Sequence, residues 1–190
     1  MWPWGHLAVA YLLYAGYARR RLDSPPLAVP ALAVALGSQF PDLIDKPLAW
    51  SIGVLPGGRT LTHSLLVAAV LLPPVVRLAA RLQRRGVGVA FAVGYLSHLA
   101  ADVPPAVLTG EFAGARFLLW PLLEAPPEDP VGGLLDAVLH YYEMGIYETV
   151  QFVLLAAAIF VWYRDGTPGL EYPRRLLAGA SERWRAERPR

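Results

Sequence analysis

The stretch GYLSHLAAD at residues 94–102 places a histidine, His98, and a carboxylate, Asp102, four residues apart in an otherwise apolar run. In a helix, both side chains would project from the same face, one turn apart. Moving an imidazole and a carboxylate out of water costs free energy unless a partner compensates for the lost hydration. A bound metal ion is the simplest such partner, so this stretch predicts part of a metal site.

The composition is typical of a membrane protein. Of the 190 residues, 55% are hydrophobic and only 17% are charged, which is more apolar than an ordinary soluble domain. We expect one membrane-embedded helical domain at 1–164, followed by a polar, basic tail at 165–190. The chain has no cysteine, which excludes disulfides and thiolate metal ligands. Its first residues show neither the basic region nor the cleavage site of a signal peptide.

The basic residues alternate with the apolar runs. Arginines follow the first run, end a later one and fill the tail, whereas Lys46, Arg59 and Arg116 stand apart from these clusters. Such an asymmetry is what the positive-inside rule produces in a membrane protein. A nucleic-acid-binding surface would not explain the alternation, so no nucleic-acid partner is expected.

Apolar runs separated by proline and glycine predict an all-α fold, namely a polytopic membrane bundle of about four to six membrane helices. The predicted helices are residues 7–18 (from residue 2 if the start is counted), 27–36, 62–83, 86–101 and 141–163.

Several boundaries of these helices are also predicted. The second helix is expected to stop at Gly37-Ser38, before a polar loop at 39–60. Thr62 is the expected N-cap of the third helix, and the Pro73-Pro74 pair is expected to kink that helix. Residues 117–123 are too short to span a bilayer and are predicted to be re-entrant or interfacial.

Potential metal ligands gather at one end of the predicted helices, and the arginine clusters gather at the other. Because consecutive spanning helices alternate in direction, the ligands should meet at one membrane face. They are His6 before the first helix, Asp42 and Asp45 after the second, His63 at the start of the third, His98 and Asp102 at the end of the fourth, and His140 and Glu143 at the start of the last.

The residue types indicate which metal is expected. Imidazole nitrogens and carboxylate oxygens are ligands of zinc, with manganese as the alternative. The expected ligands outnumber what one tetrahedral zinc ion needs, so one ion or two ions bridged by Asp42 are both open. The metal ligands that we predict are His6, Asp42, His63, His98, Asp102 and His140.

Each of these residues also has an ordinary structural explanation. His98 and Asp102 could pair for stability alone, and His63 could be incidental to a helix start. Asp42 follows a proline, a combination that is common in turns. Considered together, the histidines and aspartates favour a metal site.

A metal ion with an open coordination position lowers the pKa of bound water to about 7 and so supports hydrolysis. The predicted catalytic residues are Asp45 and Glu143, as nearby carboxylates that could accept a proton, and Arg59, which could neutralise an anionic transition state. Glu143 and His140 share a helical face, but HxxE spacing often arises by chance, so they are candidates for supporting residues or a second metal. The chain contains no glycine-rich phosphate loop, Ser-His-Asp pattern or HExxH motif.

Four short motifs together resemble the YdjM-type family of membrane-bound metal-dependent hydrolases. They extend over roughly the first 125 residues and read Gly5-His6, Pro41-Asp42, Arg59-x-x-Thr62-His63-Ser64 and Gly94-x-x-Ser97-His98-x-x-x-Asp102. The resemblance implies a multi-helix integral membrane protein with a histidine/aspartate metal site.

Two positions depart from the family pattern. The family often has histidine immediately before the arginine of the third motif, where this chain has Gly58. Its second aspartate often follows the first by two residues, whereas Asp45 follows Asp42 by three, so Asp45 matches the pattern least closely. More loosely, the order His, Asp, His, HxxxD is similar to zinc-dependent phospholipase C and its nuclease relatives, which suggests phosphodiester chemistry.

Our leading hypothesis is a multi-pass protein of the cell membrane that hydrolyses a phosphoester or lipid-like substrate. Its metal site would lie at the non-cytoplasmic face, and its tail would be cytoplasmic. One alternative is a non-enzymatic membrane protein that carries or senses a metal ion. Another is a soluble all-α metalloenzyme with apolar helices. The oligomeric state is left open.

Overall fold

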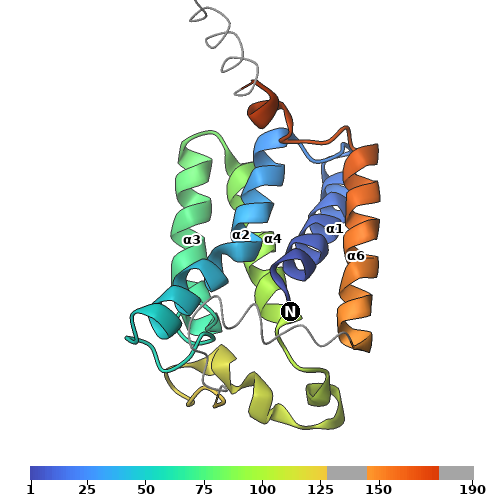
Figure 1. Ribbon diagram of the computed structural model, residues 1–190. Coiled ribbons are helices and arrows are strands. Elements are labelled where there is room, and N and C mark those ends of the chain that lie inside the picture. Colours follow the sequence, from blue (N-terminus) through green and yellow to red (C-terminus); the bar gives the residue numbers. More distant parts are fainter. Residues whose placement is uncertain (128–144, 176–190) are drawn as a thin grey trace, which may run out of the picture.

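The computed structural model describes residues 1–127 and 145–175, and within these ranges the regular structure is entirely helical (Figure 1). The predicted all-α fold is therefore confirmed for the described residues. The elements are α1 (Pro3–Arg21), α2 (Ala28–Lys46), the π-helical turn η1 (Pro47–Ser51), α3 (Leu65–Arg81), α4 (Arg85–Ala101), the 3-10 helices η2 (Pro105–Thr109) and η3 (Phe112–Leu119), and α6 (Ile146–Arg164).

Some predicted features lie outside the described residues. They are His140 and Glu143, the expected start of the last helix at residue 141, and residues 176–190 of the expected tail.

The long helices run alternately up and down, with α4 at the centre (Figure 1). α4 packs against α1, α2 and α3, and α6 packs against α1. One end of the bundle therefore collects the start of α1, the end of α2, the start of α3, the end of α4 and the start of α6. The potential metal ligands lie at this end, as the sequence predicts.

α2 does not stop at Gly37-Ser38 but continues to Lys46, so the predicted helix end was wrong. The first residues of the predicted loop at 39–60 are therefore helical. Gly37 lies inside the helix, where its lack of a side chain allows α2 to pack closely against α4. A Cβ added there would lie 2.2 Å from the carbonyl oxygen of Phe91. Gly94 serves the same approach from α4, since a Cβ there would lie 2.3 Å from the carbonyl oxygen of Val34. The helix continues through Pro41 to Lys46, which places both following aspartates on α2 instead of in a loop.

The start of α3 also differs from the prediction. Its N-cap is Ser64, whose hydroxyl accepts a hydrogen bond from the backbone N–H of Leu66 at 3.1 Å. Thr62, the expected N-cap, donates its hydroxyl to Asp45 instead. The helix then runs without interruption through Pro73 and Pro74.

The segment expected to be re-entrant or interfacial is a short connection at the end of the bundle that holds the potential metal ligands. η3 ends at Leu119, and a turn with a cis peptide bond before Pro121 follows it. Phe117 is the one buried residue of η3 and contacts the ring of His63 edge-on, with the ring centroids 6.3 Å apart.

Within the described residues, α6 is the helix that is long and apolar enough to cross a membrane, with a mean hydropathy of 1.6. Only two of its residues, Gln151 and Ala158, are buried.

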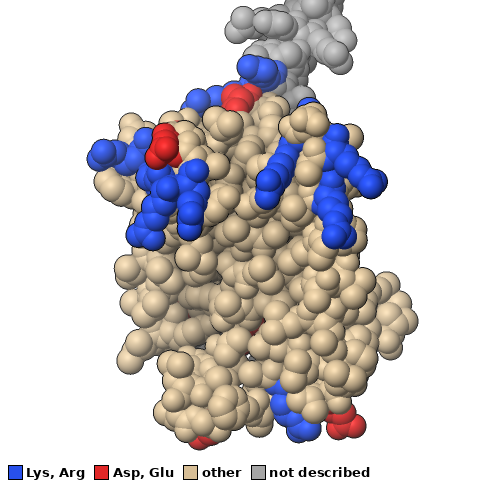
Figure 2. All heavy atoms as spheres, turned by 180° about the vertical axis from the view of Figure 1, so that it is seen from behind, with Lys and Arg blue, Asp and Glu red and all other residues tan. Residues whose placement is uncertain are grey.

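Charged side chains concentrate towards the two ends of the molecule, and Figure 2 shows a broad uncharged surface between them. The end away from the potential metal ligands carries arginines from the last turns of α1 and α3 and from the start of α4. The predicted separation of arginines from ligands is thus present in the fold.

Candidate metal centre

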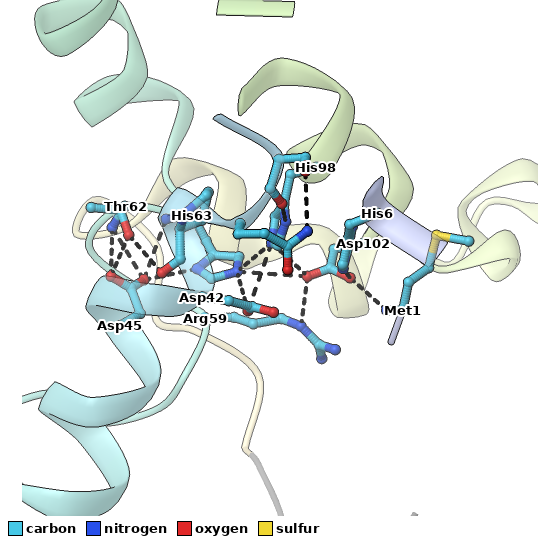
Figure 3. Close-up of polar contacts among 12 residues, drawn as sticks. Met1, His6, Asp42, Asp45, Arg59, Thr62, His63, His98 and Asp102 are labelled. Atoms are coloured by element: carbon cyan, nitrogen blue, oxygen red, sulfur yellow. Dashed lines mark hydrogen bonds and ion pairs between the residues drawn. The ribbon is translucent and has the colours of Figure 1, made fainter. Parts of the chain in front are cut away.

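A cluster of histidines and aspartates fills the interior at the end of the bundle opposite the arginines (Figure 3). Each residue in it is at most 9% exposed. α1 supplies His6, α2 supplies Asp42 and Asp45, the turn before α3 supplies His63, and α4 supplies His98 with Asp102 at its C-cap. The fold therefore brings together every predicted histidine and aspartate of the site that lies in the described residues.

His63 and His98 point their Nε2 atoms at each other, 3.1 Å apart. The Nδ1 atom of His98 lies 2.6 Å from the backbone carbonyl of Ser38, so that nitrogen must carry the proton. The Nδ1 atom of His63 lies 2.9 Å from the carboxylate of Asp45 and donates there in the same way. In the neutral imidazoles, both Nε2 atoms then present lone pairs to the same space, an arrangement typical of metal-binding histidines.

Two carboxylate oxygens face the same space. Oδ1 of Asp42 lies 3.4 Å from Nε2 of His63 and 3.7 Å from Nε2 of His98. Oδ2 of Asp102 lies 3.6 Å from each of these nitrogens. Four potential ligand atoms, two nitrogens and two oxygens, thus converge from α2, α4 and the turn before α3.

The spacing of these atoms fits a small tetrahedral ion. Ligand atoms held ~2.0–2.1 Å from a tetrahedral zinc ion lie ~3.3–3.4 Å from one another. Asp42, His63 and His98 form a set of three ligand atoms with separations of 3.1–3.7 Å, and Oδ2 of Asp102 lies 3.6 Å from both histidine nitrogens. Among the described residues, four buried side-chain polar atoms make no well-aligned hydrogen bond, and three belong to this cluster: Oδ1 of Asp42 and both ring nitrogens of His6, of which Nε2 has Asp102 within ion-pair distance. Natural proteins rarely leave such atoms unpaired, so the cluster fits a metal ion.

His6 forms a second, overlapping group with His98 and Asp102. Its Nε2 atom lies 3.2 Å from Oδ1 of Asp102, the oxygen that faces away from His63. The ring stacks on that of His98, with centroids 3.7 Å apart. The same Asp102 oxygen accepts a hydrogen bond from the amino group of Met1 at 2.8 Å. His6 therefore lies beside the four converging atoms, where it could bind a second ion or handle a proton.

Asp45 is buried, but its carboxylate faces the turn before α3 instead of the four converging atoms. It accepts hydrogen bonds from the backbone N–H groups of Thr60 and Thr62 at 2.9–3.1 Å, and from the Thr62 hydroxyl at 2.6 Å. It also binds Nδ1 of His63, the nitrogen on the far side of the ring from the potential metal position. The structure thus places Asp45 behind a ligand, where it holds the orientation of His63.

Two cationic side chains border the centre in addition to the amino group of Met1, and sequence reasoning gave a role to only one of them. Arg59 donates from Nε to Oδ2 of Asp102 at 3.1 Å. Lys46, which the sequence analysis noted only as standing apart from the arginine clusters, donates from Nζ to Oδ2 of Asp42 at 2.5 Å. Its spacing of four residues from Asp42 could have identified it once α2 was known to continue past Pro41.

Sequence reasoning also missed the groups that support the ligands. The hydroxyl of Tyr95 donates to the carbonyl of Thr62 and ties the turn before α3 to α4. Gln151 of α6 accepts from the backbone N–H of Trp2 at 2.8 Å and so fixes the start of α1 near His6. Neither residue has an assigned role in a recognised motif. The signal available in the sequence is that each places a polar group within an apolar run.

The charges of the centre support one another. Burial opposes protonation of His63, but hydrogen bonds with the Asp42 and Asp45 carboxylates outweigh it and hold the pKa of this imidazole above its usual value. Burial likewise opposes ionisation of Asp102, yet the adjacent His6 ring and the charge of Arg59 hold the pKa of its carboxyl well below the usual range. Asp102 is therefore a carboxylate at neutral pH and available to a cation.

The family model of the YdjM inner membrane protein matches residues 1–167, which include every element of the centre described above. The resemblance drawn from the four sequence motifs is thereby confirmed. No curated protein and no solved structure matches the chain.

Proposed function

The chain belongs to the YdjM family of inner membrane proteins, and on that premise we propose that it is a multi-pass membrane hydrolase with a buried divalent metal ion. Its substrate would be a phosphoester or lipid-like molecule that reaches the centre from the membrane surface.

The surface of the bundle supports a multi-pass arrangement beyond the one helix that meets the length and hydropathy criteria. α1, α2 and α6 have 19 residues and so extend about 28 Å, close to the ~30 Å hydrocarbon core of a bilayer. Large apolar side chains are exposed along all the long helices, for example Leu13, Leu36, Val70, Leu96 and Phe160. Soluble monomers rarely expose so much contiguous apolar surface, whereas lipid would cover it. The uncharged belt in Figure 2 lies between the charged ends.

The arginine distribution supports a definite orientation. Arginine-rich connections remain on the cytoplasmic side of a membrane. The arginine end of the bundle would then be cytoplasmic, together with the C-terminal tail, and the histidine–aspartate centre would lie at the non-cytoplasmic face.

The observation that carries the metal proposal is the convergence of four lone-pair atoms, the Nε2 atoms of His63 and His98 with Oδ1 of Asp42 and Oδ2 of Asp102. Zinc fits this set of two nitrogens and two oxygens, with manganese as the alternative. A second ion would use His6 and Oδ1 of Asp102, since these atoms form the overlapping group.

When bound to three of these groups, such an ion would keep an open position for water, lower the pKa of that water to about 7 and polarise the bond to be cleaved. The side chains of the chain supply the rest. With a single ion present, Nε2 of His6, beside Oδ1 of Asp102, is placed to accept the proton that the water releases. Arg59, with a side chain 39% exposed, lies at the border of the centre and would stabilise negative charge on the reacting group. Asp45 orients His63 and does not act as the base.

The charge balance favours an anionic substrate. The three aspartates of the centre face three cations, namely Lys46, Arg59 and the amino group of Met1. One divalent ion would leave a small positive excess in a largely buried site, and a phosphate group would complement it.

The first test is the metal content of the detergent-purified protein, measured by elemental mass spectrometry. We expect one or two equivalents of zinc or manganese in the native chain and none in a His98→Ala/Asp102→Ala double variant that keeps its helical circular dichroism. An Asp23→Asn/Arg84→Ala variant changes two charged groups at the other end and should keep the metal. A native protein that stays metal-free after reconstitution with zinc and with manganese would refute the proposal.

Turnover is then tested with p-nitrophenyl phosphate, bis(p-nitrophenyl) phosphate and a p-nitrophenyl carboxylate ester in mixed micelles. We expect metal-dependent release of nitrophenolate from one of the phosphate compounds, abolished in the His98→Ala/Asp102→Ala variant. A protein that binds metal tightly but cleaves none of these probes would overturn the hydrolase and leave the metal-carrying membrane protein as the better description.

A further inference from the structure

Lys46 is the only lysine in the chain, whereas arginine occurs sixteen times. Every other permanently charged basic side chain is therefore a guanidinium, including Arg59, which contacts Asp102 of the same centre. The one side-chain ammonium group of the protein lies next to the proposed metal position. The question is therefore which property of an ammonium group, absent from a guanidinium, matters at this position.

Lys46 holds one oxygen of a proposed ligand and leaves the other available. Its Nζ lies 2.5 Å from Oδ2 of Asp42, one helical turn earlier on α2. The other oxygen, Oδ1, has no hydrogen-bond partner and faces Nε2 of His63 and of His98. Asp42 is thus prepared to offer a single oxygen to an ion.

Trp50 supports the ammonium group from the second side. Nζ of Lys46 lies 5.6 Å from the centroid of the Trp50 ring, within the range of a cation–π contact. The ring is itself fixed against Gly58, where an added Cβ would lie 3.0 Å from the indole. Gly58 directly precedes Arg59, so the ring packs between Lys46 and the segment that carries Arg59.

A guanidinium at position 46 would not leave Asp42 in this state. Arginine presents a planar fork that pairs with both oxygens of a carboxylate, whereas the ammonium is a compact point charge that occupies one. An arginine would therefore compete with the ion for Oδ1.

We propose that Lys46 is a positioning residue that restricts Asp42 to one-oxygen ligation and thereby makes the centre prefer zinc over manganese. A carboxylate that offers one oxygen suits a four-coordinate ion, while a carboxylate free to offer both suits ions with more oxygen ligands. This inference rests on the proposed metal centre and adds to it the selection between the two candidate ions.

The experiment measures the affinities of zinc and of manganese for the full-length chain in detergent, each by competition with a chelating dye. The variants are Lys46→Met, which keeps the length of the side chain, Lys46→Arg, which keeps the charge, and Trp50→Leu, which removes the support. Arg116→Met is the matched control, because it removes an exposed cation from η3, outside the centre.

We expect zinc affinity to fall about 10-fold to 100-fold in Lys46→Met, the usual cost of losing a group that orients a ligand, with a smaller fall or a gain for manganese. Lys46→Arg should weaken both metals, Trp50→Leu should show part of the Lys46→Met effect, and the control should match the native chain. An unchanged ratio of zinc to manganese affinity in Lys46→Met would overturn the inference while leaving the metal centre intact. If the native chain binds neither metal, the proposed function itself fails.

A second measurement uses the native sequence and therefore does not require any variant to fold. Reductive methylation with 13C-formaldehyde labels the single lysine and the terminal amine, so the lysine gives one assignable dimethylamine resonance. Zinc added to the labelled protein should shift this resonance, because charge is withdrawn from Asp42. Tight zinc binding without any shift would contradict the proposed coupling between Lys46 and Asp42.

Discussion

The two ends of the bundle each bury an aspartate, and they treat it differently. At the arginine end, the side chain of Asp165 is 3% exposed, and both of its oxygens are paired, one with Arg19 and one with the hydroxyl of Tyr11. At the other end, the side chain of Asp42 is 9% exposed, and only one of its oxygens is paired, with Lys46.

Burial of a carboxylate therefore does not by itself indicate a site. Asp165 links the end of α6 to α1. Both of its carboxylate oxygens have hydrogen-bond partners, so a structural role explains it fully. Asp42 and His6 keep unpaired atoms in the interior, at a cost that a purely structural residue would avoid. Unpaired lone pairs that converge from several elements distinguish the candidate site.

The largest effect should come from a test of where the two ends lie. Because the chain has no cysteine, Ser51→Cys at the metal-centre end and Gly86→Cys at the arginine end each introduce a single thiol, and both positions are exposed. In whole cells, a membrane-impermeant maleimide should label Ser51→Cys and leave Gly86→Cys unlabelled until the cells are lysed. The reverse pattern would invert the proposed orientation, and equal labelling of both would contradict opposite sides.

The difference between Asp42 and Asp165 can be tested by replacing each with asparagine. Asp42→Asn should reduce zinc affinity more than about 100-fold, beyond the loss expected from an outer-shell group, because it removes a ligand. It should change the stability of the metal-free protein little. Asp165→Asn should leave zinc affinity unchanged and lower the free energy of unfolding by about 1–3 kcal/mol, because one of its two donors then faces an amide NH2 instead of an acceptor oxygen.

Zinc titration and thermal unfolding in detergent, both run on each variant, provide the measurement. If the two variants show the same pattern, the distinction between a satisfied and an unsatisfied aspartate has no functional meaning.

The smallest effect should come from Asp45, which supports a ligand without facing the four converging atoms. Asp45→Asn should weaken zinc binding about tenfold, because the amide still accepts hydrogen bonds from the turn but orients Nδ1 of His63 less strongly. Asp23→Asn, an exposed change at the arginine end at a positive φ that asparagine adopts readily, is the control and should leave zinc binding unchanged. A total loss of zinc in Asp45→Asn would instead make Asp45 a direct ligand.

Much of the site was predictable because its chemistry is local. His98 and Asp102 lie one turn apart on an apolar helix, and this spacing alone places them on one face. His63 lies just before α3, close to the predicted helix start at residue 62 although outside the helix itself. The alternation of arginines and ligands along the chain also predicts their separation to opposite ends, because helices that alternate in direction bring alternate ends together.

The errors occurred where a contact between distant residues overrides a local preference. A glycine such as Gly37 usually favours the end of a helix. Here its lack of a side chain allows α2 to pack closely against α4, and this packing stabilises the continued helix. Thr62 resembles an N-cap, but the carboxylate of Asp45 competes successfully for its hydroxyl, and Ser64 caps α3 instead. The role of Asp45 could not be read from its spacing, because its partners are 15 to 18 residues away in the chain.

The sequence by itself determined the helical, apolar character of the protein, the family and the identity of the histidines and aspartates, since these follow from composition, periodicity and short motifs. Only the tertiary structure decided which atoms of those side chains meet, which oxygen of Asp42 is left for an ion, and that Asp45 and Lys46 act through their neighbours. The physical reason is that hydrogen bonding and metal binding depend on the direction of individual lone pairs, which is set by the packing of helices distant in the chain.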